Sequence, residues 1–197
     1  MTLFDELLTD VYDLTNRADL VNETAIAIKS ATLKAHRLDF FSKDIYETGV
    51  SFPELTYRQS LDYIALIPNF RAIKYIRAVN SSTDDLGVKI EIITPDEITD
   101  SYGLNRNDIA YVAGRVLEIR SSVQFQYMLL GAYVLPIVTT PDYSSWVAEQ
   151  FKYAIVFEAA RLIFKTIGQM EESNGYRQMV AEEYSILTRD GISDVGF

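Results

Sequence analysis

The segment over residues 151–167 constrains this chain most, because its pattern predicts a helix that is apolar almost all round. At 100° per residue, Glu158, Arg161 and Lys165 fall within one narrow arc. Most of the remaining surface is apolar: Ala154, Ile155, Val156, Phe157, Ala159, Ala160, Leu162, Ile163 and Phe164. Such a helix must be covered by its own fold or by neighbouring subunits.

The residues after this helix are typical of an assembly subunit. Tyr176, Met179, Val180 and Leu187 predict one face of an amphipathic helix. Residues 189–197 are not periodic, and we expect them to form a C-terminal arm. A packed helix followed by a free arm is what a subunit of a larger assembly needs, whereas an enzyme has no particular need of it.

The composition is that of an ordinary globular chain with one substantial core. It has 197 residues, of which 48% are hydrophobic and 23% charged. Cysteine is absent, which excludes disulfides and thiolate metal sites. The first ten residues are acidic where a secretion signal would be basic. The apolar run over residues 125–143 contains Gly131 and two prolines, so we expect strand rather than a membrane span.

The net charge of −10 disfavours tight binding to a phosphate backbone, which depends on clustered Lys and Arg. It is compatible with a surface past which DNA slides, because repulsion between acidic side chains and DNA phosphates would suppress binding. It is equally compatible with acidity that only aids solubility.

Helical and strand patterns alternate along the chain in blocks. Thr2 and Asp5 resemble a capping box before a first helix, and a second helix is predicted from about residue 20 to 38. Residues 70–79 and 88–93 predict paired strands. Residues 108–119 and 125–138 predict a long hairpin, over residues 108–139, joined by residues 120–124. Gly114 and Gly131 inside it suggest bulges or close backbone approach.

These blocks predict an α+β fold in a single domain over residues 1–197. The N- and C-terminal helices, residues 1–39 and 142–188, would form a helical bundle core. Residues 40–141 would be a β-rich insertion, with an antiparallel β-sheet region and the long hairpin. Residues 189–197 would be the C-terminal arm.

The sequence predicts no catalytic, cofactor-binding or metal site. His36 is the only histidine, so a multi-histidine metal site cannot be built, and we expect its side chain to be solvated. A serine such as Ser42 or Ser60 would have to meet it for nucleophilic catalysis, and no spacing supports this. Adjacent carboxylates such as Asp96 and Glu97 point in different directions and make poor acid/base pairs.

One basic cluster stands out, on the strand that holds Arg71, Lys74 and Arg77 beside Tyr75. Strand alternation places Arg71 and Arg77 on one face and Lys74 on the other. A solvated strand face is therefore favoured over a nucleic-acid patch.

Several aromatic and apolar residues are candidates for protein contacts. Trp146 is interpreted first as a core plug at a strand-to-helix junction, and second as an interface anchor. The candidates for contacts between subunits are Phe125, Tyr127, Met128, Tyr133 and Trp146. The candidates for docking by the C-terminal arm are Ile192, Val195 and Phe197, with a frayed end as the alternative.

Several stretches together resemble the head-to-tail adaptor proteins of tailed bacteriophages, with the greatest likeness to those of short-tailed phages. They are AIAIKSATLKAHRLDFFSKDI, FRAIKYIRAV, GVKIEIITPDEITDSYG, NDIAYVAGRVLEIRSS and PDYSSWVAEQFKYAIVFEAARLIFKTIGQ. They cover most of the chain.

The resemblance implies a structural connector that is not an enzyme and needs no cofactor. It implies a ring of twelve copies under the portal protein, at the head–tail interface of a virion assembled in the host cytoplasm. The C-terminal arm would dock on the portal, while hub, nozzle or fibre proteins of the tail would bind the other face. The ring would line the channel through which genomic DNA passes without specific binding, and no membrane is involved.

Three alternatives remain open at this point. The chain could be another tail ring, such as a stopper or terminator. It could be a hydrolase that uses paired carboxylates, although their geometry is poor. Tyrosines on strands also leave a carbohydrate-binding module possible.

Overall fold

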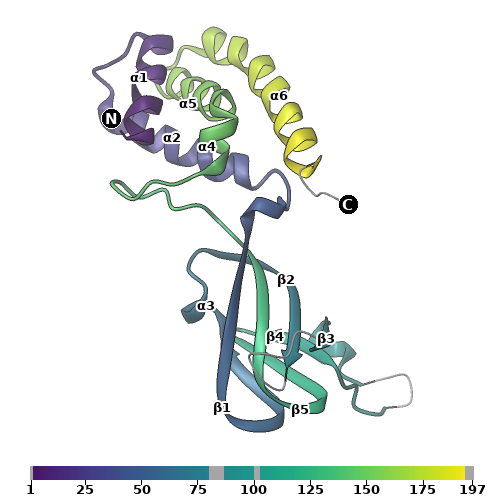
Figure 1. Ribbon diagram of the computed structural model, residues 1–197. Helices are drawn as coiled ribbons and strands as arrows, with labels where there is room; N and C mark the ends of the chain where they lie inside the picture. Colours follow the sequence, from purple (N-terminus) through teal and green to yellow (C-terminus); the bar gives the residue numbers. More distant parts are fainter. Residues whose placement is uncertain (1, 80–86, 100–102, 194–197) are drawn as a thin grey trace. The chain divides into compact units, whose positions relative to one another are not determined.

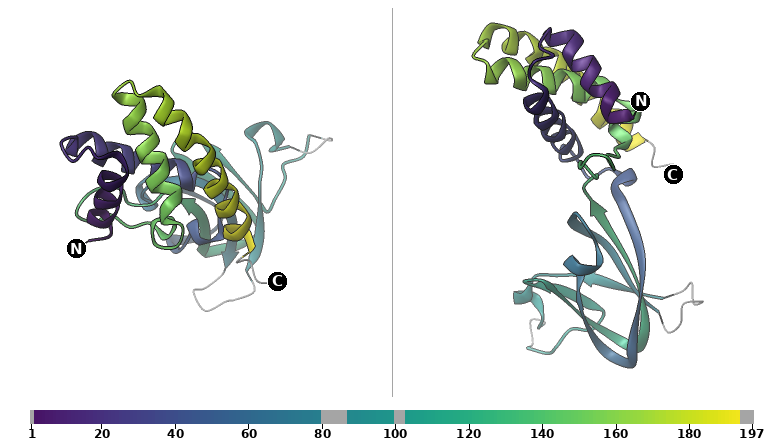
Figure 2. Two further views of the ribbon diagram at one scale, coloured as in Figure 1. Left: turned by 90° about the horizontal axis from the view of Figure 1, so that it is seen from above. Right: turned by 90° about the vertical axis from the view of Figure 1, so that its left-hand side faces the viewer.

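The structure is a computed structural model that describes residues 2–79, 87–99 and 103–193. The chain divides into two compact units, each drawn in Figures 1 and 2. Residues 1–44 and 135–197 form a helical unit, and residues 45–134 form a β unit. Each unit has a hydrophobic core of its own.

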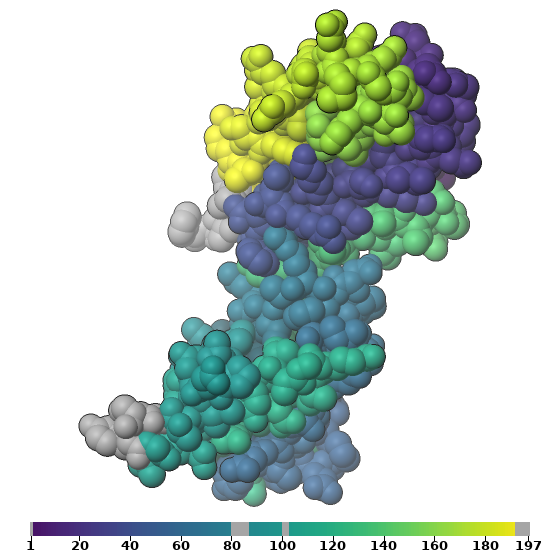
Figure 3. Space-filling view, turned by 180° about the vertical axis from the view of Figure 1, so that it is seen from behind, coloured from purple at the N-terminus to yellow at the C-terminus, as the bar shows by residue number. Residues whose placement is uncertain are grey.

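The helical unit is built around α5 (Lys152–Thr166), which packs against α1 (Leu3–Thr15), α2 (Val21–His36) and α6 (Met170–Ser193). The short elements η1 (Ser42–Asp44) and α4 (Trp146–Gln150) complete it. Segments from both ends of the chain share its surface, as the space-filling view shows (Figure 3). The apolar helix predicted over residues 151–167 is thus confirmed, and helices of the same chain cover it.

Local signals explain where the first two helices begin and end. Thr2 and Asp5 form the predicted capping box, in which the Thr2 Oγ1 accepts from the Asp5 amide at 3.2 Å and Asp5 accepts from the Thr2 amide at 2.9 Å. Asn16 ends α1 in the left-handed conformation, with φ 51°. The buried face of α2 consists mostly of small residues, among them Thr24 and Ala31.

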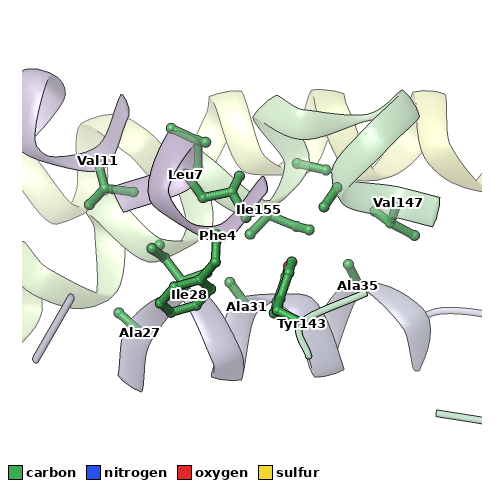
Figure 4. Close-up of a cluster of buried hydrophobic side chains, with 14 of the residues drawn as sticks. Phe4, Leu7, Val11, Ala27, Ile28, Ala31, Ala35, Tyr143, Val147 and Ile155 are labelled. Atoms are coloured by element: carbon green, nitrogen blue, oxygen red, sulfur yellow. The ribbon is translucent and has the colours of Figure 1, made fainter. Parts of the chain in front are cut away.

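The core of the helical unit joins residues far apart in the sequence. Phe4 and Leu7 of α1 meet Ile28 of α2 and Ile155 of α5 (Figure 4). Tyr143, from the segment before α4, packs on Phe4 with ring centroids 5.2 Å apart. Its hydroxyl lies 2.7 Å from the Thr32 hydroxyl, so the polar end of this buried tyrosine is satisfied.

The β unit is a closed four-stranded barrel with one extra strand. Its strands are β1 (Ile45–Asp62), β2 (Phe70–Val79), β3 (Val88–Ile92), β4 (Ile109–Ala113) and β5 (Val116–Val134). The pairs β5–β2, β2–β3 and β4–β5 are antiparallel, and a parallel β3–β4 pair closes the barrel. The long strand β1 runs antiparallel along the other edge of β5. The short helices are α3 (Tyr63–Leu66) and η2 (Pro95–Glu97).

The predicted fold class, a helical bundle core with an inserted antiparallel sheet region and long hairpin, is wrong. A closed barrel replaces the open sheet, and the parallel β3–β4 pair is not an antiparallel hairpin contact. Because Ile76, Leu117, Met128 and Leu130 fill the inside of this barrel, the β unit does not use the helices as its core. Because the barrel closes between β4 and β5, the free edge of the sheet lies on β1.

The predicted hairpin also has its turn in the wrong place. Residues 120–124 continue β5 without interruption, and the chain reverses instead at Gly114 and Arg115, between β4 and β5. Gly114 has φ +63°, which glycine adopts without steric cost. β1 continues past Phe52 and Pro53, and its register with β5 shifts between Ser51 and Thr56.

Replacing Gly131 should destabilise the β unit. Gly131 of β5 lies opposite Tyr75 of β2, and an added Cβ would come within 2.5 Å of the tyrosine ring. We expect Gly131→Ala to lower the free energy of unfolding by about 1–3 kcal/mol, because the ring must move. Urea denaturation measures this change.

Gly175→Ala is the matched control for this substitution. Gly175 lies inside α6 with open space around it, so alanine should raise helix stability by about 0.5–1 kcal/mol. A Gly131→Ala chain as stable as the wild type would contradict the close contact with Tyr75.

Candidate functional site

Three of the predicted interface residues lie inside the β unit. Phe125 and Met128 have no exposed surface, and Tyr133 is 6% exposed. They belong to the chain's own interior and leave almost no surface for a neighbouring subunit. Tyr127 is half-buried, and its hydroxyl lies over Gly49 of the adjacent strand β1.

Trp146 begins α4 and is half-buried in the helical unit. Its Nε1 donates to the Asp44 Oδ1 at 2.7 Å, and its ring contacts Phe41 with centroids 5.2 Å apart. The Lys43 ammonium lies 5.1 Å from the ring centroid. Trp146 thus packs within the helical unit at the start of α4.

The residues proposed for docking by the C-terminal arm are placed only in part. Residues 189–193, which begin the predicted arm, lie in α6, and Ile192 is among them. Val195 and Phe197 lie outside the described residues.

A serine, a histidine and an aspartate form a hydrogen-bonded chain in the helical unit. His36 Nδ1 lies 2.8 Å from the Asp44 Oδ1, and His36 Nε2 lies 2.9 Å from the Ser145 Oγ. His36 is 1% exposed, so the expectation that it is solvated is wrong. Its partners are Asp44 and Ser145, and neither Ser42 nor Ser60, the serines considered from the sequence, takes part.

The hydrogen-bonded series of Ser145, His36 and Asp44 has the residue types and order of a catalytic triad. Its serine, however, is not accessible to a substrate. Ser145 is 3% exposed, and its Oγ also accepts the Ala148 amide at 3.2 Å as the N-cap of α4. A nucleophile needs room for a substrate carbonyl beside it, and this hydroxyl is enclosed. The network instead fastens α2, η1 and α4 to one another.

A second buried cluster centres on Glu158 of α5. Its side chain is 1% exposed and accepts from Arg161 through two contacts of 2.8 Å and from Lys34 of α2 at 2.8 Å. Burial raises the pKa of Glu158, but the hydrogen bonds and charges of Arg161 and Lys34 outweigh burial and leave this pKa below its usual value. A single carboxylate thus joins two helices from opposite ends of the sequence.

Lys74 and Arg77 of β2 line the same hollow of the β unit, contrary to the alternation expected from the sequence. Lys74, Tyr75 and Arg77 line a hollow together with Lys89 of β3 and Glu47 of β1. The register of β2 against β5 shifts between Ile73 and Tyr75, and this bulge brings Lys74 to the same face as Arg77.

Tyr75 and Glu47 are hydrogen-bonded at the centre of this hollow. Burial, and then the bond to Glu47, raise the pKa of Tyr75 to about 12. The carboxylate of Glu47 offsets part of the positive charge of Lys74, Arg77 and Lys89.

The acidic pairs within the described part of the chain do not converge on a metal site. Glu97 caps η2, where it accepts from the Thr94 amide at 2.9 Å, and this bond lowers the pKa of Glu97. Within residues 2–79, 87–99 and 103–193, no group of three or more acidic or histidine side chains could hold a metal ion. In the same residues, no helix is long and apolar enough to cross a bilayer.

Comparisons with known proteins identify no family for this chain. A scan against protein-family models found none that matches the chain. A search of curated proteins found no sequence similar to it.

Removing the Ser145 hydroxyl should destabilise the helical unit. Ser145→Ala deletes both the N-cap of α4 and the partner of the His36 Nε2, so we expect a loss of about 1–3 kcal/mol in the free energy of unfolding. Ser144→Ala, at an exposed neighbour, should change it by less than about 0.5 kcal/mol. Labelling of Ser145 in the folded chain by a fluorophosphonate would contradict its enclosure.

Glu158→Gln should make stability less dependent on acid pH. Because the pKa of Glu158 is lowered in the folded chain, its contribution is present above the ordinary value of 4.5 and is lost as pH falls through the lowered pKa. At pH 7 we expect the variant to lose roughly 3 kcal/mol, since two cations lose their partner.

Urea denaturation between pH 7 and pH 3 measures this difference. The gap between wild type and Glu158→Gln should narrow as pH falls, whereas the exposed control Glu149→Gln should follow the wild type throughout. A gap that stays constant across this range would contradict the assigned role of Glu158.

Proposed function

We propose that this chain is a structural connector of a tailed-phage virion, a ring subunit that joins the portal to the tail. The sequence stretches that resemble head-to-tail adaptors motivate the proposal. The arrangement of the exposed apolar side chains is the observation that carries it.

Both units present paired apolar side chains at their surfaces. On α6, Met179 and Ile186 are seven residues apart and so share a face, and they are 47% and 37% exposed. On β1, Leu55 and Tyr57 are two residues apart, and both are exposed. Single exposed apolar residues are normal on any protein, but pairs on two separate units suit a subunit with several partners.

A subunit of a ring needs several separate contact surfaces. A subunit in a cyclic ring meets its two neighbours through different patches, and a connector must also contact the rings above and below. The acidic surface supports the same proposal, because a negatively charged wall would let DNA pass without adhering.

The polar clusters support a structural role in a further way. The chain from Ser145 through His36 to Asp44 and the ion pairs of Glu158 each tie separate helices together within the helical unit. A subunit that bears load between two large bodies gains from such cross-links.

Deletion of the gene from the phage that carries it tests the proposal. We expect heads that have packaged DNA but lack tails, counted by electron microscopy, and recovery of tailed particles when the wild-type chain is supplied. Met179→Asp with Ile186→Asp should fail to restore tails, because charge on the α6 face opposes apolar contact.

Ser185→Asp is the control, since it adds charge to an exposed polar position of the same helix. It should restore tailed particles. Normal tailed particles in the absence of the chain would overturn the proposed function.

A further inference from the structure

A hollow of about 480 Å³ lies in the helical unit, where α2, α5 and α6 meet, and it is lined by an excess of cations. Lys34 comes from α2, Arg161 and Lys165 from α5, and Arg177 from α6. Glu158 is the only carboxylate in this lining. The hollow is therefore strongly positive, although the whole chain carries a net charge of −10.

The ion pairs inside the hollow leave part of this positive charge unmatched. The Glu158 carboxylate is occupied by Arg161 and Lys34. Lys165 and Arg177 are exposed, and neither forms an ion pair with any residue that the structure describes. Two cations are thus free to receive a further anion.

Tyr184 adds a hydrogen-bond donor to the same hollow. Its hydroxyl is buried and has no hydrogen-bond partner among the described residues. Burial and the charge of Glu158 raise the pKa of Tyr184, so its proton is retained. A buried hydroxyl without a partner is costly.

The rim of the hollow favours a protein partner over a nucleic acid. Leu38 and Met170 line it, and their side chains are 38% and 52% exposed. Apolar side chains beside cations favour contact with a protein surface, whereas a phosphate backbone offers nothing for them to contact.

The chain itself contains a helix with the complementary charges. Glu6 and Asp13 of α1 are seven residues apart and lie on one face, and neither forms an ion pair within the part of the chain described. In Figures 1 and 2, α1 and α6 lie on opposite sides of α5. The acidic face and the basic hollow are thus two different patches of one helical unit.

We propose that this hollow binds the acidic face of α1, with Glu6 and Asp13, from a second copy of the chain. Two different patches that meet in this way form a head-to-tail contact, which closes into a ring when the rotation between copies permits. The inference deepens the proposed function and rests on it, because it names the contact between neighbours in the proposed ring.

Charge exchange tests this contact directly. Lys165→Glu with Arg177→Glu makes the hollow acidic, and Glu6→Lys with Asp13→Lys makes the α1 face basic. Each double variant should weaken self-association about tenfold or more, measured by sedimentation equilibrium at low salt. A 1:1 mixture of the two variants should restore it, because each altered patch then meets a complementary one.

Two controls separate this contact from general effects of charge. Lys74→Glu with Lys89→Glu makes the same charge change in the β unit and should leave self-association unchanged. Thermal unfolding of every variant confirms that the helical unit is folded. Double-stranded DNA is added as a probe, and binding that is lost on Lys165→Glu with Arg177→Glu would assign the hollow to phosphate instead.

The outcomes for this contact and for the connector function are distinguishable. The contact would be overturned if both double variants self-associated as strongly as the wild type. It would also be overturned if the wild-type chain stayed monomeric at its highest soluble concentration. If the same variants still restore tails to particles that lack the chain, the connector function stands and this contact alone falls. Loss of association in both variants with no rescue in the mixture would also overturn it.

Discussion

The burial of α5 is the interaction on which the helical unit depends. Its apolar surface is covered by α1, α2 and α6, elements that come from both ends of the chain. The sequence left open whether this cover comes from the same chain or from neighbouring subunits, and the structure assigns it to the same chain. Contacts with other proteins must therefore use the exposed residues of the two units, not the faces of α5 that line the core.

One charged residue in α5 shapes much of the surrounding chemistry. Glu158 is buried and holds Arg161 and Lys34, and it leaves Lys165 and Arg177 as surplus cations nearby. Burying a carboxylate is costly unless it is paired, so the fold requires Arg161 and Lys34 beside Glu158. Lys165 and Arg177 are additional to these pairs, and they make the hollow basic in a chain whose net charge is acidic.

The sequence predicted the helices better than the strands, for reasons visible in particular residues. The capping box of Thr2 and Asp5 is a local signal, and the structure contains it. The barrel depends on pairs distant in sequence, such as Glu91 with Ile109, which no local pattern reveals. The bulge in β2 at Lys74 brings this side chain to the same face as Arg77, which simple strand alternation did not predict. His36 was misjudged because its partner Ser145 is 109 residues away.

The central claim is that the chain joins a portal to a tail as a ring. Mass measurement of the purified chain, of the portal protein encoded by the same phage, and of their mixture tests it most directly. The account predicts a complex that contains one portal ring and a complete ring of this chain. A mixture in which both proteins keep their separate masses at every concentration would contradict it.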